Sequence, residues 1–465
     1  MAKYQKYVEY KDSGVEWLGK IPSHWRLFAL KRSVDKCTNG FWGAEPDGVN
    51  DLCVLRVADF NRDNFEINLD KLTYRSVLPK EAESRLLKNG DLLIEKSGGG
   101  EKTLVGCVVQ FDKDFPAITS NFVAKMTPNC NMDSRFLTYS FAHLYAGRVN
   151  YPAIKQTTGI QNLDSEAYLM ENFCFPPAIE QTQIALFLDH ETAKIDSLIA
   201  KQEKLIELLK EKLQAVISHA VTKGLNPDVE MKNSGVEWLG KVPEHWDVRQ
   251  LRFLGTCQNG INIGAEYFGS GSPFISYGDV YRNPQLPKVF EGLVQSTEND
   301  RKLYSIKRGD VLFTRTSETI EEIGFSSASL GDVENATFAG FLIRFRPKQE
   351  TLLPEYSRFY FRNLLLRAFF VKEMNLVTRA SLSQELLKKL PVTLPSLNEQ
   401  KQIADFLSQK DQIFEKLIQN SIVQISLLKE RRTALISSAV TGKIDVRNWQ
   451  NPNNNNNEAK TEFSV

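Results

Sequence analysis

The sequence predicts an α+β fold that is built twice: a mixed α/β module and one long helix, then a second module and a second long helix. Three observations lead to this prediction. The chain contains an internal repeat, each half has strand-like apolar runs bounded by glycine turns, and each half ends in a long amphipathic stretch without glycine or proline. With 465 residues, the chain is long enough for two or three domains.

The internal repeat sets the organisation of the chain. Residues 13–25 return as residues 234–246, and only Ile21 and Ser23 are replaced in the second copy. A repeat of this length indicates a duplicated unit. Further matches at nearly the same offset pair residues 37–40 with 257–260, 89–93 with 308–312, 177–185 with 396–404, and 220–222 with 439–441.

Strand-like runs such as residues 91–94 and 310–313 occupy about 150 residues in each half. We call residues 26–175 module 1 and residues 247–394 module 2. The complete predicted division is an N-terminal segment 1–25, module 1, a helix segment 176–225, a linker with the repeated opener 226–246, module 2, a helix segment 395–446, and a tail 447–465 expected to be disordered.

The two long stretches are predicted to be helices, because their apolar residues recur in steps of three, four and seven. Prolines stand before each stretch, and Gly224 and Gly442 follow the ends. A lone helix with such a stripe is unstable, so the two helices are expected to pair as a coiled coil. The predicted stripes are Ile184, Phe187, Leu188, Ile195, Leu198, Ile199, Leu205, Leu209, Val216 and Ala220, and Ile403, Phe406, Leu407, Phe414, Leu417, Ile418, Ile425, Leu428, Leu435 and Ala439.

Composition excludes several classes of protein. No apolar run is long enough for a membrane span, and the first residues lack a signal-peptide pattern, so we expect a cytoplasmic protein. The six cysteines are far apart and are expected to be buried free thiols rather than disulfides or zinc ligands. The formal charge of +1 is lower than usual for a DNA-binding chain, although a basic face can be masked by acidic surfaces elsewhere.

Two motifs resemble functional sites but are expected to be structural. Residues 14–20 match the spacing of a phosphate-binding loop, yet Ile21 stands where Ser or Thr would hold magnesium, and Trp17 crowds the loop. We expect Trp17, Leu18, Ile21 and Trp25 to pack on a core. The repeated His24 and His245 have no partner at metal-ligand spacing, which favours a structural role. No catalytic, cofactor or metal site is predicted.

The doubled plan, the opener Gly-Val-Glu-Trp-Leu-Gly-Lys-x-Pro-x-His-Trp and the helix entry Glu-Gln-x-x-Ile-Ala-x-Phe-Leu resemble the specificity subunits of type I restriction–modification systems. The resemblance covers residues 8–446. It implies that modules 1 and 2 are DNA target recognition domains, one for each half of a bipartite asymmetric DNA site. It also implies that the two helices form an antiparallel coiled coil with pseudo-twofold symmetry and hold the readers apart.

The same resemblance implies that catalysis belongs to other chains. Two modification (methyltransferase) subunits are expected to dock and methylate adenine, and restriction/translocase subunits then join them. S-adenosylmethionine, ATP and magnesium are expected on these partner subunits, with no cofactor on this chain and no membrane partner. Two alternatives remain open: a coiled-coil scaffold that binds only proteins, and a specificity subunit of a methylation-only complex that lacks restriction.

Candidate DNA contacts are polar residues in module loops, because such side chains read base edges and phosphates. The first candidates follow the Gly-Asp strand of each half, where glycines in module 1 permit close approach to a groove. The candidates in module 1 are Lys96, Ser97, Gly98, Lys102 and Thr103, then Asn39, Trp42, Asn121, Lys155, Gln156, Thr157 and Thr158. Those in module 2 are Arg315, Thr316 and Ser317, then Asn259, Asn262, Tyr277, Thr337, Arg379 and Ser381.

A further stretch of module 2 alternates basic and aromatic residues. It fits either a phosphate-facing helix or a core helix with a charged outer face, and the sequence leaves both open. Its residues are Arg358, Arg362, Arg367 and Lys372 with Phe359, Tyr360, Phe369 and Phe370.

Overall fold

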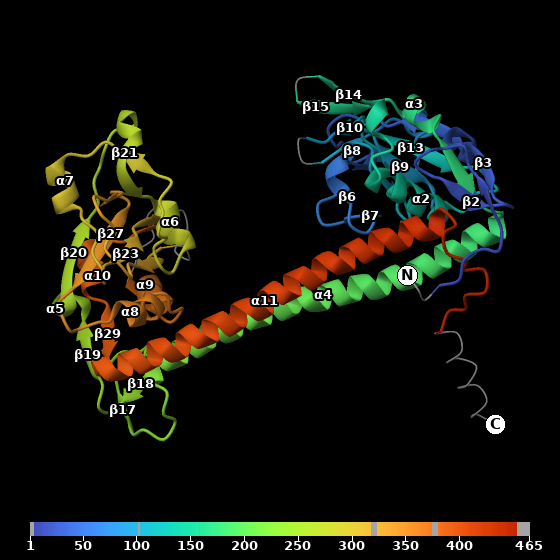
Figure 1. Ribbon diagram of the computed structural model, residues 1–465. Coiled ribbons are helices and arrows are strands. Elements are labelled where there is room, and N and C mark those ends of the chain that lie inside the picture. The colour runs from blue at the N-terminus through green and yellow to red at the C-terminus, as the bar shows by residue number, and fades with distance from the viewer. Residues whose placement is uncertain (1–3, 101–102, 158, 318–322, 374–379, 453–465) are drawn as a thin grey trace. The chain divides into compact units, whose positions relative to one another are not determined.

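The computed structural model describes residues 4–100, 103–157, 159–317, 323–373 and 380–452 (Figure 1). The chain forms two compact units. Unit 1 consists of Met1–Gln202 and Val423–Val465, and unit 2 consists of Glu203–Ile422. Unit 1 therefore contains module 1 and both chain ends, whereas unit 2 is a single continuous segment that contains module 2.

Module 1 is built on a four-stranded antiparallel sheet and a three-stranded mixed sheet. In the second sheet β5 pairs parallel with β12 and antiparallel with β8. The order of the first sheet is β11 (Val108–Gln110), β9 (Leu92–Glu95), β13 (Val123–Pro128) and β4 (Val34–Asn39), and that of the second is β12 (Ala117–Thr119), β5 (Asp51–Leu55) and β8 (Tyr74–Ser76).

Module 2 repeats both sheets in the same order. In its second sheet, β21 again pairs parallel with a neighbour, β26, and antiparallel with β22 on its other side. The first sheet consists of β25 (Ser326–Ala328), β23 (Val311–Thr314), β27 (Leu342–Pro347) and β20 (Gly255–Asn259), and the second of β26 (Thr337–Phe338), β21 (Phe268–Ile275) and β22 (Leu293–Val294).

Each module is closed by its own first and last strands. In module 1, β3 (Arg26–Ala29) pairs with β16 (Asn172–Phe175), and Arg26 lies opposite Phe175. In module 2, β19 (Asp247–Gln250) pairs with β29 (Pro391–Leu394), and Asp247 lies opposite Leu394. The ends of the segments 26–175 and 247–394 are thus adjacent in space within each module.

The elements around these sheets differ between the modules. Module 1 carries η1 (Leu30–Ser33), η2 (Val57–Asp59), the hairpin β6 (Phe60–Asn61) and β7 (Glu66–Ile67), α1 (Pro79–Ala82), α2 (Ser134–Ala146), η3 (Tyr151–Ala153), α3 (Ser165–Leu169) and a small sheet of β10 (Ser97–Gly98), β15 (Ile160–Leu163) and β14 (Ile154–Thr157). Module 2 carries α5 (Leu251–Leu254), η4 (Ala265–Tyr267), α6 (Tyr277–Arg282), α7 (Glu298–Leu303), α8 (Pro354–Tyr360), α9 (Leu366–Glu373), α10 (Gln384–Lys388) and the strand pair β24 (Thr316–Ser317) and β28 (Ala380–Ser381).

The repeated opener forms a β-hairpin in both units. It consists of β1 (Tyr10–Asp12) and β2 (Lys20–Pro22) in unit 1, and of β17 (Met231–Asn233) and β18 (Lys241–Pro243) in unit 2. The loop that matches a phosphate-binding pattern joins two strands, whereas a phosphate-binding loop leads into a helix. The structure therefore assigns these residues to a turn, as the sequence indicated.

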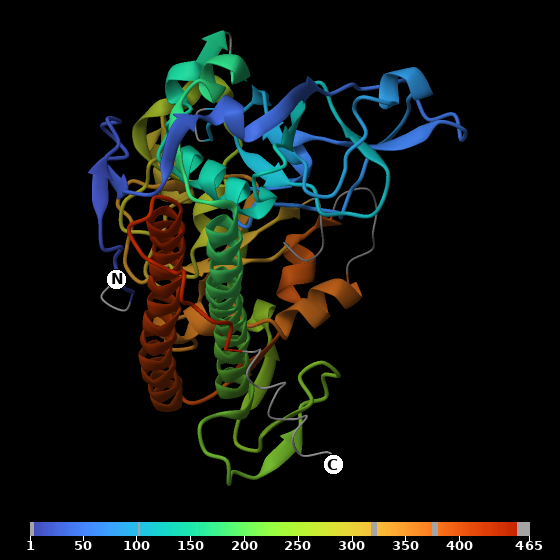
Figure 2. The same cartoon turned by 90° about the vertical axis from the view of Figure 1, so that its right-hand side faces the viewer.

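The long helices are α4 (Ala178–Lys223) and α11 (Leu397–Val440), and each contributes to both units. In unit 1 the first half of α4 lies beside the second half of α11, where Ile195 and Leu435 share one core (Figures 1 and 2). In unit 2 the second half of α4 packs with the first half of α11, through Val221 and Leu407. These pairings make the two helices antiparallel.

The predicted apolar stripe is unevenly buried, since Ile195 and Ile418 are at most 8% exposed but other positions are open. Near the middle, Leu198, Leu205 and Leu417 are 45%, 42% and 44% exposed. The prediction that these three side chains pack in the stripe was wrong, because the neighbouring helix does not cover them. Among the described residues, the model has no helix with the length and apolar character needed to cross a membrane.

The prediction for the cysteines was wrong in part. All six thiols are free, and Cys53, Cys107 and Cys174 are buried, but Cys37 and Cys130 are exposed. Burial raises the pKa of the Cys53 thiol to about 11 and that of Cys107 to about 12, so both remain protonated at neutral pH.

Candidate nucleic-acid interface

A glutamate near the start of each long helix binds side chains of the opener. In unit 1, the Glu180 carboxylate accepts hydrogen bonds from Tyr7 Oη (2.6 Å) and Trp25 Nε1 (2.9 Å), and it also contacts His24 Nε2 at 2.8 Å. In unit 2, Glu399 accepts from Trp246 Nε1 (2.9 Å) and contacts His245 Nε2 at 3.0 Å. These contacts agree with the structural role predicted for both histidines.

The residues predicted to pin the opener differ in their exposure. Leu18, Ile21 and Trp25 are at most 3% exposed, whereas Trp17 is 40% exposed and stacks on Phe173 at 6.3 Å between ring centroids. Trp17 thus packs against a core residue, as predicted, although its own ring lies at the module surface.

The ends of both long helices bind the opener hairpins in the same way. Lys223, at the end of α4, donates hydrogen bonds to the carbonyls of Leu239 and Lys241 in unit 2. Lys443, just after α11, donates to the carbonyls of Leu18 (3.2 Å) and Lys20 (2.6 Å) in unit 1. The backbone N–H of Asp445 also donates to the Gln5 carbonyl at 2.8 Å. The two copies of the duplicated unit are therefore assembled by equivalent contacts.

The candidate residues Asn39 and Asn259 are each followed by a glycine that passes very close to another stretch of backbone. We call this close approach a glycine crossing. Gly40 passes so close to the chain that a Cβ built there would lie under 3.0 Å from the carbonyl oxygens of Thr119 and Ser120. Gly260 meets the carbonyls of Phe338 and Ala339 in the same way. Only glycine fits such a crossing, so both asparagines are held at a fixed place beside the turn before β13 or β27.

Lys96 and Arg315 occupy equivalent places beside this turn. The backbone N–H of Lys96 donates to the Phe122 carbonyl (2.8 Å), and that of Arg315 donates to the Phe341 carbonyl (2.9 Å). The Lys96 ammonium also donates to Asn39 Oδ1 at 2.6 Å. The structure thus brings together the predicted residues Asn39, Lys96 and, in the turn, Asn121.

Module 2 assembles the equivalent cluster from different side chains. Asn259 ends β20, and Arg315 precedes β24, where Thr316 pairs with Ser381 of β28. The side-chain amide oxygen of Asn262 lies against Gly340 in the turn. Asn259, Asn262 and Arg315 therefore lie at this turn, and Thr316 and Ser381 lie in the strand pair that begins next to Arg315.

The small sheet of module 1 presents further predicted residues. Ser97 Oγ donates to Asn162 Oδ1 (2.6 Å), and the exposed Lys155 pairs with Asp164 at 2.9 Å. Hydrogen bonding to Lys155 lowers the pKa of the Asp164 carboxyl, so this aspartate stays charged at neutral pH. Gly98 and Gln156 lie on this sheet, and Thr103 follows at its edge, where its carbonyl accepts from Gly100 N–H at 2.9 Å.

Three predicted residues are placed differently from the rest. Thr337 is 0% exposed, so its side chain is inaccessible to DNA in this structure, which contradicts the prediction of a surface contact. Trp42 lies under the Arg75 guanidinium at 4.6 Å, and Tyr277 stacks on Tyr281 at 5.9 Å. Lys102, Thr158 and Arg379 lie outside the described residues, as do the side chains of Thr157 and Ser317.

The basic and aromatic stretch of module 2 forms two helices, α8 and α9, rather than one. Phe359, Tyr360, Phe369 and Phe370 belong to the core of unit 2. The Arg362 guanidinium donates to backbone carbonyls, including those of Ser326 (2.9 Å) and Tyr281 (2.7 Å). Arg358 contacts Gln285 and Asp411. Of the two readings left open by the sequence, the structure favours a core role.

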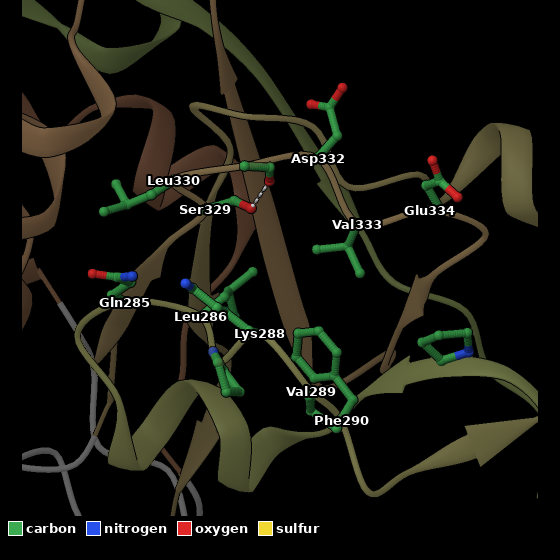
Figure 3. A pocket seen from close by; sticks show the side chains of 13 residues that line it. Gln285, Leu286, Lys288, Val289, Phe290, Ser329, Leu330, Asp332, Val333 and Glu334 are labelled. Carbon is green, nitrogen blue, oxygen red and sulfur yellow. Dashed lines mark hydrogen bonds between the residues drawn. The ribbon is translucent and has the colours of Figure 1, made fainter.

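A hollow in module 2 is lined by none of the candidate DNA-contacting residues. It measures about 520 Å³ and is lined by residues 285–290, residues 329–334 and Pro273. Figure 3 shows the Asp332 and Glu334 carboxylates at its rim, near Val333. Lys288 is the only cation of the lining, so the two carboxylates make the hollow unsuited to a phosphate.

Sequence reasoning missed Phe122 and Phe341, the aromatic residues in the turn before β13 of module 1 and before β27 of module 2. We call this turn the shared turn. Both are exposed, at 57% and 62%. The available signal was their position relative to the cations, since Phe122 follows Lys96 and Phe341 follows Arg315 by the same number of residues. Among the described residues, no group of three or more His, Cys, Asp and Glu side chains is arranged to hold a metal ion.

Comparison with known proteins gives a consistent result. Residues 243–426 match the family model described as the type I restriction modification DNA specificity domain. The chain is 24% identical over 452 residues to the type I restriction enzyme EcoKI specificity subunit of Escherichia coli K12, covering 94% of this chain and 92% of that protein. It is 22% identical to the StySPI specificity subunit of Salmonella potsdam, covering 94% and 92%.

Solved structures share the fold. The HsdS subunit from Thermoanaerobacter tengcongensis aligns with a TM-score of 0.51 and 15% identity, covering 91% of this chain and 98% of that one. A chain from a study of complex assembly and conformational transition of the type I R-M system aligns with a TM-score of 0.68 and 14% identity, covering 90% and 98%.

Proposed function

Because this chain belongs to the family of type I restriction–modification specificity subunits, we propose that it recognises a DNA site made of two unlike halves and catalyses no reaction itself. Module 1, residues 26–175, reads one half, and module 2, residues 247–394, reads the other. The observation that carries this proposal is the repetition of one pair of sheets in both modules while the surrounding elements differ.

The reading surface of each module is the cluster around the shared turn. Asn39 and Asn259 offer amides that can pair with a base edge, and Lys96 and Arg315 offer cations for phosphates or guanine. Ser97, Asn121 and Gln156 in module 1, with Asn262 and Thr316 in module 2, complete the proposed contacts. The polar side chains differ between modules, which suits two different half-sites.

The partners proposed for this chain are two modification subunits and, after them, restriction/translocase subunits. We propose that the modification subunits bind the long helices and the adjoining opener hairpins, and that they carry the S-adenosylmethionine used to methylate adenine. The exposed apolar side chains Leu198, Leu205 and Leu417 on α4 and α11 support a protein contact there. ATP and magnesium belong to the restriction subunits in this proposal.

An exchange of one module tests the two-reader proposal. Residues 26–175 are replaced with the first module of a related specificity subunit, and the hybrid is purified with a type I modification subunit. Sequencing of the methylated sites should show that one half of the target changes and the other stays. The reciprocal exchange of residues 247–394 is the matched control, and a change of both halves in either hybrid would contradict the proposal.

The purified chain alone separates this proposal from an enzyme and from a scaffold that binds only proteins. With S-adenosylmethionine, ATP and magnesium it should neither methylate nor cut DNA. With the modification subunit added, it should retain DNA that contains the target. Activity of the homogeneous chain would contradict the non-catalytic role, and a complex that never retains DNA would favour the scaffold. Methylation without any cleavage in the complete system would favour a methylation-only complex.

A further inference from the structure

An exposed phenylalanine stands at the same point of both modules. Phe122 is 57% exposed and Phe341 is 62% exposed, whereas the next residues, Val123 and Leu342, are fully buried. Each phenylalanine follows the parallel strand of the second sheet and precedes the central strand of the first. The two modules therefore expose the same side chain although the two residues before it change from Ser-Asn to Ala-Gly.

Backbone hydrogen bonds fix the main chain at both phenylalanines. The turn before Phe122 is closed by Val123 N–H donating to the Ser120 carbonyl (2.9 Å), and the turn before Phe341 by Leu342 N–H donating to the Ala339 carbonyl (3.0 Å). The carbonyl of each phenylalanine then accepts the N–H of the adjacent cationic residue. A turn whose main chain is already ordered loses little conformational freedom when it meets a ligand.

A single exposed apolar residue needs no explanation in most proteins. Phe253 is an example, because it is also 57% exposed, it packs under the Arg252 guanidinium at 4.8 Å, and Arg32 stands at the matching position of the repeat. Phe122 and Phe341 differ from it in two respects. They recur in both modules, and each lies beside a cation and a fixed asparagine.

We propose that Phe122 and Phe341 are base-contacting residues, one in each half of the DNA site. The ring enters a groove and packs against base atoms, while the adjacent Lys96 or Arg315 reaches the backbone phosphates. Phenylalanine is suited to this contact because it can pack on a thymine methyl group or wedge against a base face. This inference rests on the proposed DNA-reading function and adds the residues that would anchor each module in its half-site.

The test uses the full chain in complex with a modification subunit. Phe122→Ala and Phe341→Ala are compared with the parent and with Phe253→Ala, a control of equal exposure outside the cluster. Sites methylated by the parent complex are sequenced first, and a duplex with that site then serves for binding. Each of the two test variants should bind about ten-fold more weakly and should relax discrimination in one half-site only, a different half for each.

Folding is checked separately by thermal unfolding, which the two truncations should leave unchanged because the rings are exposed. Phe122→Leu, which keeps an apolar side chain, should recover part of the affinity. Replacing single thymines of the duplex with uracil then shows whether the ring contacts a methyl group, since the Phe122→Ala penalty should vanish at that thymine.

The outcomes distinguish this inference from the proposed function. Parent affinity and parent site preference in both Phe122→Ala and Phe341→Ala would overturn the inference and leave the proposed function intact. A parent complex that shows no sequence-specific binding or methylation would overturn the proposed function itself. A loss in Phe253→Ala equal to that of the test variants would also overturn the inference.

Discussion

The two modules have the same interior plan but use different side chains to hold it. In module 1, Asp91 accepts a hydrogen bond from the Thr127 hydroxyl at 2.9 Å, whereas in module 2 the matching Asp310 binds the Arg346 guanidinium through both oxygens, at 2.7 and 2.6 Å. The strand order of both sheets, and the parallel strand pair in the second sheet, are the same in the two modules. The comparison teaches that the backbone pairing tolerates a neutral contact and an ion pair at the same place.

The modules differ most at the periphery. Module 1 has a hairpin, β6 with β7, after β5, whereas module 2 has helix α6 after β21. Elements outside the two sheets can change while the sheet pairing is kept, and binding residues commonly lie in such segments. A common interior with divergent loops is thus a means for one fold to present two different reading surfaces.

The largest effect is expected where the modules are most alike. Gly40→Ala and Gly260→Ala should each lower the free energy of unfolding by about 3 kcal/mol, because the added Cβ collides with two backbone carbonyls that cannot move alone. Denaturant unfolding measures this, with Gly100→Ala as control, since nothing lies within 4 Å of a Cβ there. A large loss of unfolding free energy in only one of the two variants would show that the two glycine crossings are not equivalent.

A smaller and unequal effect is expected at the helix glutamates. The Glu180 side chain is 7% exposed and that of Glu399 is 23% exposed. Glu180→Ala leaves the buried Tyr7 hydroxyl and Trp25 N–H without their partner, and should cost about 2 kcal/mol. Glu399→Ala should cost about 1 kcal/mol, because water can reach its partners. Unfolding of both variants at one pH measures the difference, and equal losses would contradict this burial argument.

The smallest effect is a pH dependence present in unit 1 alone. Burial, assisted by Lys443, lowers the pKa of His143 to about 4. Neutral His143 therefore contributes stability above its ordinary pKa of about 6.5, and this contribution is lost as the pH falls toward 4. At the corresponding place in unit 2, Asn363 accepts a hydrogen bond from Ser218 Oγ at 2.6 Å and does not titrate.

His143→Asn should consequently reduce the loss of unfolding free energy between pH 7.5 and pH 5 by about 1 kcal/mol, with allowance for partial exposure. Denaturant titrations of parent and variant at both pH values measure it. An identical pH dependence in parent and His143→Asn would show that the buried imidazole does not titrate in this range.

Much of the architecture could be predicted because it is local or repeated. Helical periodicity located α4 and α11, and the repeated opener correctly placed Trp25 and Ile21 in a core. The partners of Arg362 could not be predicted, since they are backbone carbonyls 36 to 82 residues away in sequence. The burial of Thr337 was likewise hidden, because a two-residue strand in a parallel pair gives no alternation to read.

The candidate site was predictable only in part for a related reason. Gly-Asp strands and Asn-Gly turns marked Lys96 and Asn39, but the turn that carries Phe122 is joined to Lys96 by a backbone hydrogen bond. Almost any residue type can make a backbone hydrogen bond, so no sequence pattern marked the exposed phenylalanine ring. The repeat offered an indirect signal, because Phe122 follows Lys96 and Phe341 follows Arg315 at the same spacing.

The composition of unit 1 from two separate segments has a consequence for synthesis on the ribosome. Core residues Leu435, Ile436 and Val440 come from the segment that emerges last. Module 1 leaves the ribosome first but cannot bury its interior fully until nearly the whole chain has been made, whereas the continuous unit 2 is completed earlier. A premature stop after Ile422 would therefore spare the later module and leave the earlier one with an open core, a target for chaperones and proteases.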